Sequence, residues 1–343
     1  MISKQDFLYK VEKEILPDLI LTEKERKKAL LSGGFFFVLI VLILFLSRKI
    51  FMDDMDRLGT IIIVGLTFLF IAGCSIWSSF ISKQKEKFSS AFLRLFGDLK
   101  DDQEVIDKYL LRQTCLFSEF DDLSYDDCIS GVFDNTEFSV AETKLTHGSG
   151  KNQHTVFRGV CIDIPMSTSV SGYILLFNTR IPKHFPVLEK IKLEDDSFGK
   201  NYQIYSNSQS DSCILLNPFF RDKLTALKKC FKNKRIDISF FGNHALFAIH
   251  TASDLFEPCS LFRSVTNMKT YEKFYDEIKA IYDIINILHV DNMTSSKKVS
   301  FNQELYQQIT SIQKERSNRT FYIILGAFFL IFILIFVVGF FIS

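Results

Sequence analysis

Three long apolar runs without a charged residue dominate the hydrophobic pattern of this chain, at residues 29–47, 61–81 and 321–342. A helix rises about 1.5 Å per residue, so each run approaches or exceeds the roughly 30 Å thickness of a bilayer's hydrocarbon core. The alternative, a helix buried in a protein core, requires neighbours on every side of the helix. The pattern therefore predicts three transmembrane helices, with the first two joined as a hairpin.

Basic residues near these runs predict how the chain is oriented. Lysine and arginine cluster before the first run, after the second and before the third, and fewer lie at the opposite ends. Basic residues are enriched on the cytoplasmic side of membranes. The sequence therefore predicts a cytoplasmic N-terminal segment (residues 1–28), a transmembrane hairpin (29–81), a cytoplasmic domain (82–320) and a C-terminal transmembrane helix (321–343) that ends outside.

The clearest helix signal in the predicted domain is the pair Asn217-Pro218. Asparagine favours the N-cap position and proline the first helical position, and apolar residues then recur at Phe220, Leu224 and Leu227. This spacing predicts an amphipathic helix from residue 218. Its basic end interacts either with the negative end of the helix dipole or with anionic lipid heads.

The clearest hairpin signal follows directly. Two segments, residues 235–241 and 244–250, flank Gly242-Asn243, and glycine at the first position of a two-residue turn favours a hairpin. In this register Phe240 lies opposite Ala245, and Ile238 opposite Phe247, on an apolar face. The opposite face, called the mixed face below, carries Asp237, Ser239, His244, Leu246, Ala248 and His250.

The remaining pattern predicts an α+β fold with an antiparallel sheet and flanking helices, in addition to the three transmembrane helices. Further strands are expected at residues 136–146, 154–164 and 172–178, and further helices at 88–99, 271–288 and 301–312. A short N-terminal stripe containing Phe7, Val11 and Ile15 is expected to be interrupted by Pro17. The apolar faces of the predicted helices next to the apolar runs, at 88–99 and 301–312, serve either core packing or self-association or contact with the membrane surface.

Composition narrows the function classes. The chain has 41 basic and 40 acidic residues, whereas a nucleic-acid-binding domain normally carries a basic excess, so no nucleic-acid partner is expected. Seven cysteines are scattered without a CxxC pair, which favours reduced thiols over a disulfide framework or a zinc site.

Candidate chemistry is sparse. The sequence contains no HExxH motif and no complete phosphate-binding glycine loop, and its acidic run at Asp121, Asp122, Asp126 and Asp127 lacks the spacing of a calcium loop. His244 and His250 lie roughly 20 Å apart along a strand, too far to share a metal. We therefore assign no metal site and no cofactor, and the catalytic residues, if the protein is an enzyme, stay unknown.

A set of short motifs resembles a bacterial domain-of-unknown-function family of uncharacterised membrane proteins, in which a two-span N-terminal hairpin carries a cytoplasmic domain. The motifs, in order, are residues 129–131 (ISG), 136–139 (TEFS), 155–159 (TVFRG), 193–195 (LED), 215–218 (LLNP) and 254–258 (DLFEP). The resemblance implies a multi-pass protein of the bacterial inner membrane and suggests a LemA-type membrane protein as partner. Residues 166–172 and the third apolar run depart from the family. Among polar residues of the motifs, Arg158, Glu194 and Glu257 either hold the fold as buried groups or serve function.

Three functional hypotheses follow. The first is a non-enzymatic scaffold whose cytoplasmic domain binds membrane lipid, a second copy of itself or another membrane protein. The second is a membrane-tethered enzyme or lipid-handling protein, which requires a pocket with convergent polar groups such as Asp237, His244 and His250. The third is an exported effector inserted in host membranes.

Overall fold

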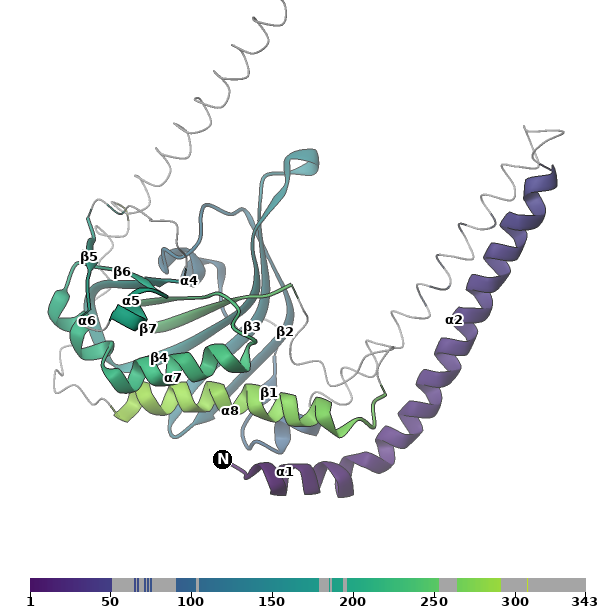
Figure 1. The fold of residues 1–343 in the computed structure, drawn as a ribbon, viewed down its shortest axis with the longest axis horizontal. Helices are drawn as coiled ribbons and strands as arrows, with labels where there is room; N and C mark the ends of the chain where they lie inside the picture. The colour runs from purple at the N-terminus through teal and green to yellow at the C-terminus, as the bar shows by residue number, and fades with distance from the viewer. Residues whose placement is uncertain are drawn as a thin grey trace, which may run out of the picture. The chain divides into compact units, whose positions relative to one another are not determined.

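The computed structural model describes residues 1–50, 91–102, 105–178, 187–193, 196–252 and 264–290, together with isolated residues 65, 67, 71, 73, 75, 185 and 307 (Figure 1). The chain divides into two compact units. Unit 1 comprises Met1–Asp101 and Phe256–Lys279, and unit 2 comprises Asp102–Leu255 and Ala280–Ser343.

Unit 1 is helical and packs around aromatic side chains. Its elements are α1 (Lys4–Lys10), the π-helical turn η1 (Val11–Ile15), α2 (Leu16–Ile50), the short strand β1 (Lys100–Asp101) and the first half of α8 (Met268–Val290). The Phe7 ring lies 4.9 Å from the Phe96 ring, and the Phe92 ring stacks on Tyr271 at 4.8 Å. The stripe of Phe7, Val11 and Ile15 is buried, as its spacing predicted.

Pro17 does not interrupt this helical segment, contrary to expectation. The N–H of Leu16 bonds to the carbonyl of Val11, five residues earlier. A proline ring clashes with the carbonyl four residues before it, and the wider π turn relieves that clash. The chain therefore changes direction between α1 and α2 but stays helical (Figure 1).

The prediction of three transmembrane helices is wrong on the available structure. Nowhere in the part of the chain that is described does a helix combine the length and the apolar composition that crossing a membrane requires. The run at 29–47 belongs to α2, whose first half is strongly charged between Glu23 and Lys28. The run at 61–81 lies mostly, and that at 321–342 entirely, outside the described residues.

The physical reason for this correction is that an apolar run reports only the composition of a segment, whereas a span requires about 20 consecutive, predominantly apolar residues within one helix. The assignment to the bacterial inner membrane, with its multi-pass topology, depended on the runs and is corrected with them. Of the helix predicted at residues 88–99, residues 91–94 are helical, residues 95–98 form turns and bends, and residues 88–90 lie outside the described residues. The helix predicted at 301–312 lies outside them except for residue 307.

Unit 2 is built on an antiparallel sheet with flanking helices, which confirms the predicted α+β class. β2 pairs with β3, β3 with β4, β4 with both β6 and β7, and β5 with β6. The strands are β2 (Asp122–Phe133), β3 (Thr136–His147), β4 (His154–Phe177), β5 (Glu189–Ile191), β6 (Gln203–Ser206) and β7 (Ile236–His250). The hairpin predicted between residues 136–146 and 154–164 is present as β3 and β4.

β7 doubles back on itself, as the Gly242-Asn243 pair predicted. The N–H of His250 donates to the carbonyl of Arg235 at 2.8 Å, although a straight strand would separate these residues by about 50 Å. Gly242 has a φ of +54°, which a residue without a Cβ adopts at little cost. Pairing Arg235 with His250 is the register that places Phe240 opposite Ala245.

β4 wraps around the tip of this hairpin, a feature that the sequence did not indicate. Its first part, Gly159 to Pro165, pairs with His250 to His244, and its last part, Tyr173 to Leu176, pairs with Phe241 to Ile238. Register shifts between Pro165 and Tyr173 let the strand turn the corner. The strand predicted at 172–178 is therefore the end of β4, and the β7 hairpin occupies the middle of the sheet.

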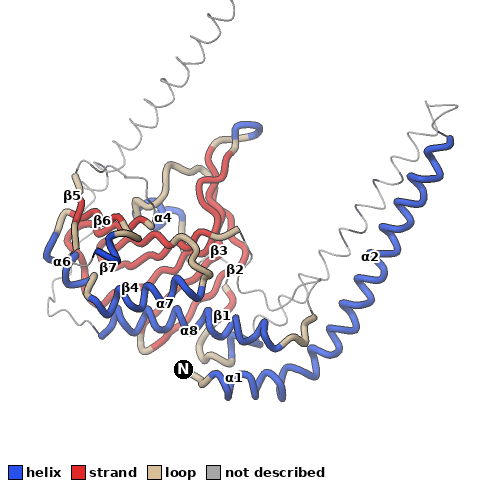
Figure 2. Tube along the Cα trace, viewed as in Figure 1, coloured by secondary structure: helices blue, strands red, loops and turns tan. Residues whose placement is uncertain are grey.

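α7 (Pro218–Cys230) and α8 pack on the apolar face of the sheet, and the segment around α4 (Lys108–Gln113) packs on the opposite face (Figure 2). α7 has the predicted N-cap, because the Asn217 side chain accepts a hydrogen bond from the N–H of Phe220. Its Phe220 ring packs on Phe240 of the apolar face at 5.8 Å. The Tyr282 ring of α8 stacks on Phe133 at 4.0 Å. The remaining short helices of unit 2 are η2 (Gly150–Asn152), α5 (Asp196–Gly199) and α6 (Gln209–Leu215).

Candidate functional site

The mixed face of the β7 hairpin is a second hydrophobic core. Leu246 and Ala248 from this face belong to one buried cluster with residues of the segment around α4, including Ile106, Leu111 and Phe120. The hydroxyl of Tyr173 donates to the carbonyl of Gln113 at 2.9 Å and fastens this segment to β4. Asp237 and Ser239 are buried beneath it. We call residues 105–120 the cover segment.

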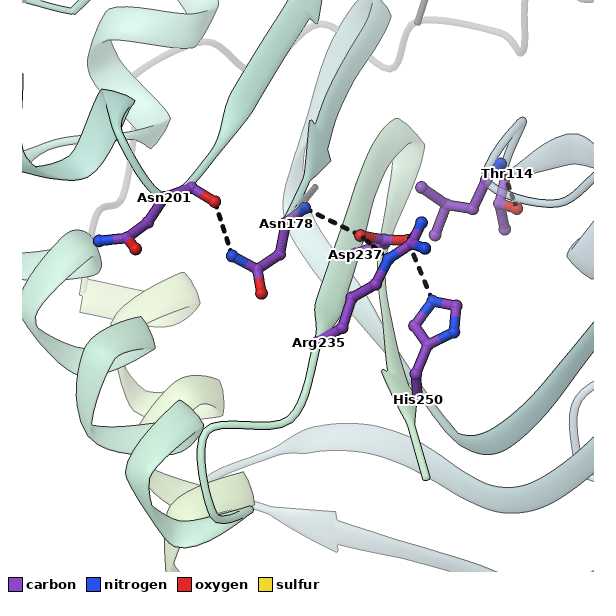
Figure 3. A network of polar contacts seen from close by, with 7 residues as sticks. Thr114, Asn178, Asn201, Arg235, Asp237 and His250 are labelled. Carbon is purple, nitrogen blue, oxygen red and sulfur yellow. Dashed lines mark hydrogen bonds and ion pairs between the residues drawn. The ribbon is translucent and has the colours of Figure 1, made fainter. Parts of the chain in front are cut away.

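Asp237 is the centre of a polar network at the open end of the hairpin (Figure 3). One carboxylate oxygen accepts from the N–H of Asn178 at 2.9 Å and from Nε of Arg235 at 3.1 Å. The other accepts from the Arg235 guanidinium and lies 3.0 Å from Nε2 of His250. Asn178 in turn donates from its side chain to the carbonyl of Asn201 at 2.6 Å. The network thus joins β4, β7 and the start of β6.

Local sequence places these groups together. Arg235 and Asp237 are two residues apart at the start of β7 and share a face, and the hairpin register returns His250 beside them. The imidazole of His250 also packs edge-on against the Phe157 ring of β4 at 4.9 Å. The imidazole of His250 is therefore held by a hydrogen bond to Asp237 on one side and by the Phe157 ring on the other.

Electrostatics stabilise Asp237 as a carboxylate. Burial raises its pKa, but the hydrogen bonds and charges of His250 and Arg235 outweigh burial and lower the pKa of Asp237 below its ordinary value. Only 2% of the Asp237 side chain is exposed, against 38% for Arg235. The pair is therefore buried on the Asp237 side only, and loss of its partners would leave the buried carboxylate without compensation.

A second carboxylate and imidazole pair lies at the tip of the hairpin. Nδ1 of His244 is 3.1 Å from both carboxylate oxygens of Asp163 on β4, and its ring stacks on Phe241 at 5.5 Å. The hydrogen bond to Asp163 raises the pKa of His244, burial opposes this, and the charges of Asp163 and Asp107 raise the pKa further. Asp107 caps α4 in the cover segment. Acidic side chains from two different parts of the fold, Asp163 on β4 and Asp107 at α4, therefore raise the pKa of His244.

The two pairs do not form a single site. His244 and His250 are six residues apart on the same arm of the hairpin, which places them about 20 Å from each other. Each has its own carboxylate partner. Asp237, His244 and His250 were the sequence candidates for a convergent site, and the structure brings together Asp237 and His250 but not His244.

Cysteine thiols near these pairs are buried. Burial raises the pKa of Cys161, beside Thr143 on β3, to about 12, and that of Cys115 in the cover segment to about 12. Thiolates are the nucleophilic form of cysteine, so both thiols are neutral and unreactive at physiological pH. Cys213 and Cys230 are exposed and reduced.

The remaining candidates lie elsewhere. His147 pairs with Asp121 at 3.0 Å, and its ring contacts His154 at the tip of the β3–β4 hairpin. Arg158 is exposed, so of its two alternatives the role of a buried group that holds the fold does not apply. Glu194 and Glu257 lie outside the described residues.

Sequence reasoning missed Asp163 and Arg235 as partners of the two histidines. The spacing of Arg235 and Asp237, two residues apart at the start of a strand, could have identified Arg235 as a partner of Asp237, because the two side chains share a face. No local signal points to Asp163, since it reaches His244 only through the pairing of β4 with β7.

Two large apolar side chains at the α6–α7 corner are half exposed. Ile214 is 50% exposed and Phe219 is 52% exposed. Lys223 lies over the Phe219 ring, with Nζ 5.7 Å from the ring centre. We call Ile214, Phe219, Lys223 and Lys229 the corner surface, in which Lys229 lies about 15 Å further along α7 than Phe219.

Comparison with known proteins shows that part of the chain is similar to a family of unknown function, which is consistent with the kind of family that the motifs resemble. Residues 155–290 match the family described as "Protein of unknown function (DUF3137)". This range extends from the start of β4 to the end of α8. The match itself gives neither a membrane location nor a LemA-type partner. No curated protein matches the chain in sequence.

Among solved structures, the chain is similar to one described as "crystal structure of the mycobacterial trehalose monomycolate transport factor A, TtfA". The two are 8% identical, with a TM-score of 0.35, over 58% of this chain and 93% of that chain. At this similarity the comparison carries no functional argument.

Proposed function

We propose that unit 2 is a non-catalytic interaction module that assembles with a second copy of the chain or with another protein. The observation that carries the proposal is the filling of the mixed face. An enzyme or lipid-handling site there needs a cavity toward which polar groups converge, whereas Leu246 and Ala248 pack in one apolar cluster with the cover segment.

The polar groups of the same face support this proposal. Both oxygens of Asp237 are engaged by Arg235, His250 and the backbone of Asn178. Asp163 engages His244 through both of its oxygens. Carboxylates and imidazoles arranged in this way hold strands together, and each already has a protein partner where a substrate would otherwise bind.

The corner surface supplies the contact area that an interaction module requires. A few well-packed, fully desolvated side chains near the centre of an interface contribute most of its binding energy, and the half-exposed Ile214 and Phe219 are available for such packing. A LemA-type protein is the heterologous partner that the family resemblance suggests.

The proposal is tested by crosslinking in the native cell, followed by affinity isolation of the full-length chain and mass spectrometry. The variant Ile214→Ser/Phe219→Ser removes the exposed apolar area of the corner surface. Tyr109→Ser is the matched control, because Tyr109 is 59% exposed on α4. We expect one crosslinked species that is lost in the double variant and retained in the control, with equal thermal stability of all three proteins. A strictly monomeric chain without a crosslinked species contradicts the proposal.

A further inference from the structure

The charges of unit 2 are segregated along the sequence although the whole chain is nearly neutral. Residues 102–137 contain ten acidic and two basic residues, whereas residues 221–235 contain seven basic and one acidic residue. The first group belongs to the cover segment, β2 and the turn into β3. The second group belongs to α7 and the start of β7. Segregated charges of opposite sign produce complementary surface potentials.

The basic segment, residues 221–235, contains the two lysines of the corner surface. Phe219 and Ile214 are half exposed, Lys223 lies over the Phe219 ring, and Lys229 is exposed on the same helix. An apolar centre with a cationic rim requires a partner with an apolar centre and an acidic rim. A second α7 cannot supply this, because two basic helices repel each other.

The turn between β2 and β3 has the complementary character. Val132 is 45% exposed and pairs with Glu137 across the hairpin. Asp134 and Asn135 form the turn with φ values of 50° and 62°. Asp134 and Glu137 are both exposed. One apolar side chain therefore lies between two exposed carboxylates.

We propose that the corner surface of one copy binds the β2–β3 turn of a second copy, so that the chain assembles head to tail. This inference rests on the proposed function and specifies its partner. Unlike surfaces on the same chain form heterologous contacts, which lead to rings or to open chains of subunits. Val132 packs against Ile214 and Phe219, and Asp134 and Glu137 pair with Lys223 and Lys229.

The test is sedimentation of the purified full-length protein and of two charge variants. Lys223→Glu/Lys229→Glu reverses the rim of the corner surface. Asp134→Asn/Glu137→Lys removes the acidic rim of the turn, and asparagine keeps the left-handed backbone at residue 134. Lys144→Glu/Lys200→Glu is the control for the first variant, because it makes the same change in charge at exposed positions outside both surfaces.

We expect concentration-dependent association of the wild type that weakens with salt. Each rim variant alone should associate at least about tenfold more weakly, because like charges then face each other across the contact. The control should match the wild type. A mixture of the two rim variants should associate again, because the native turn of one variant meets the native corner surface of the other.

A monomeric wild type, or association that persists in either rim variant, overturns the inference. The proposed function survives the first of these results if the crosslinking experiment still recovers a different protein through Ile214 and Phe219. The two proposals therefore fail on separate measurements.

Discussion

Gly159 shows how one residue determines the junction between β4 and β7. Its φ is +156°, and a Cβ built at this position would lie 1.9 Å from the carbonyl oxygen of Ile249. The neighbouring carbonyl of Arg158 accepts from the N–H of Thr251 at 3.1 Å. The glycine of the TVFRG motif is thus explained by close approach of two backbones. The sequence identified the motif, but the contact depends on a strand almost a hundred residues away and has no local signature.

We predict that Gly159→Ala lowers the free energy of unfolding by about 3 kcal/mol or more, since backbone must move to relieve the overlap. Gly199→Ala is the matched control, because nothing lies within 4 Å of a Cβ built there. Urea unfolding followed by circular dichroism measures both. Equal stability of the two variants would show that the junction yields easily.

We predict a pH-dependent contribution from His244. Its pKa is raised in the folded state by Asp163, so the stability it contributes is complete below the unfolded histidine pKa of about 6.5 and is lost as pH rises through the folded pKa. The variant His244→Gln should therefore lose more stability relative to wild type at pH 5.5 than at pH 9. Thermal unfolding of both proteins across this range measures the difference, and a difference that does not change with pH contradicts it.

At the scale of elements, local signals predicted the segments whose partners lie nearby in sequence. Asn217 caps α7 and the Gly242-Asn243 pair turns β7, because capping and turn geometry involve only a few consecutive residues. The path of β4 around the hairpin was not predictable in this way. The register shifts in β4 follow from its pairing with β7, which lies some seventy residues later in the sequence. A search for local periodicity therefore predicts two separate strands where the structure has one.

We predict that Asn217→Ala destabilises unit 2 by about 1 kcal/mol, because α7 loses the side-chain acceptor for the N–H of Phe220. Asn217→Gly should cost only a few tenths of a kcal/mol, since glycine is tolerated at N-caps. Chemical denaturation of the two variants provides the measurement. A larger loss for glycine than for alanine would indicate that Asn217 acts through packing and not as a cap.

For the whole molecule, the central claim is that both faces of the sheet are packed. The sequence indicated the apolar face correctly and left the mixed face open to a polar site. It did so because the cover segment carries its apolar residues in a short helix and irregular chain, where no periodicity marks them. The same limitation applies to the apolar runs, whose composition alone did not establish membrane spans.

Thiol labelling of the native full-length protein tests this claim most directly, because some cysteines are buried in the packed mixed face and others are exposed on the surface. Cys115 and Cys161 lie in the packed mixed face, whereas Cys213 and Cys230 are exposed. Brief treatment with a maleimide followed by peptide mass spectrometry should modify Cys213 and Cys230 and leave Cys115 and Cys161 unmodified until denaturant is added. Rapid labelling of Cys161 in the folded protein would show an open mixed face and would contradict the account.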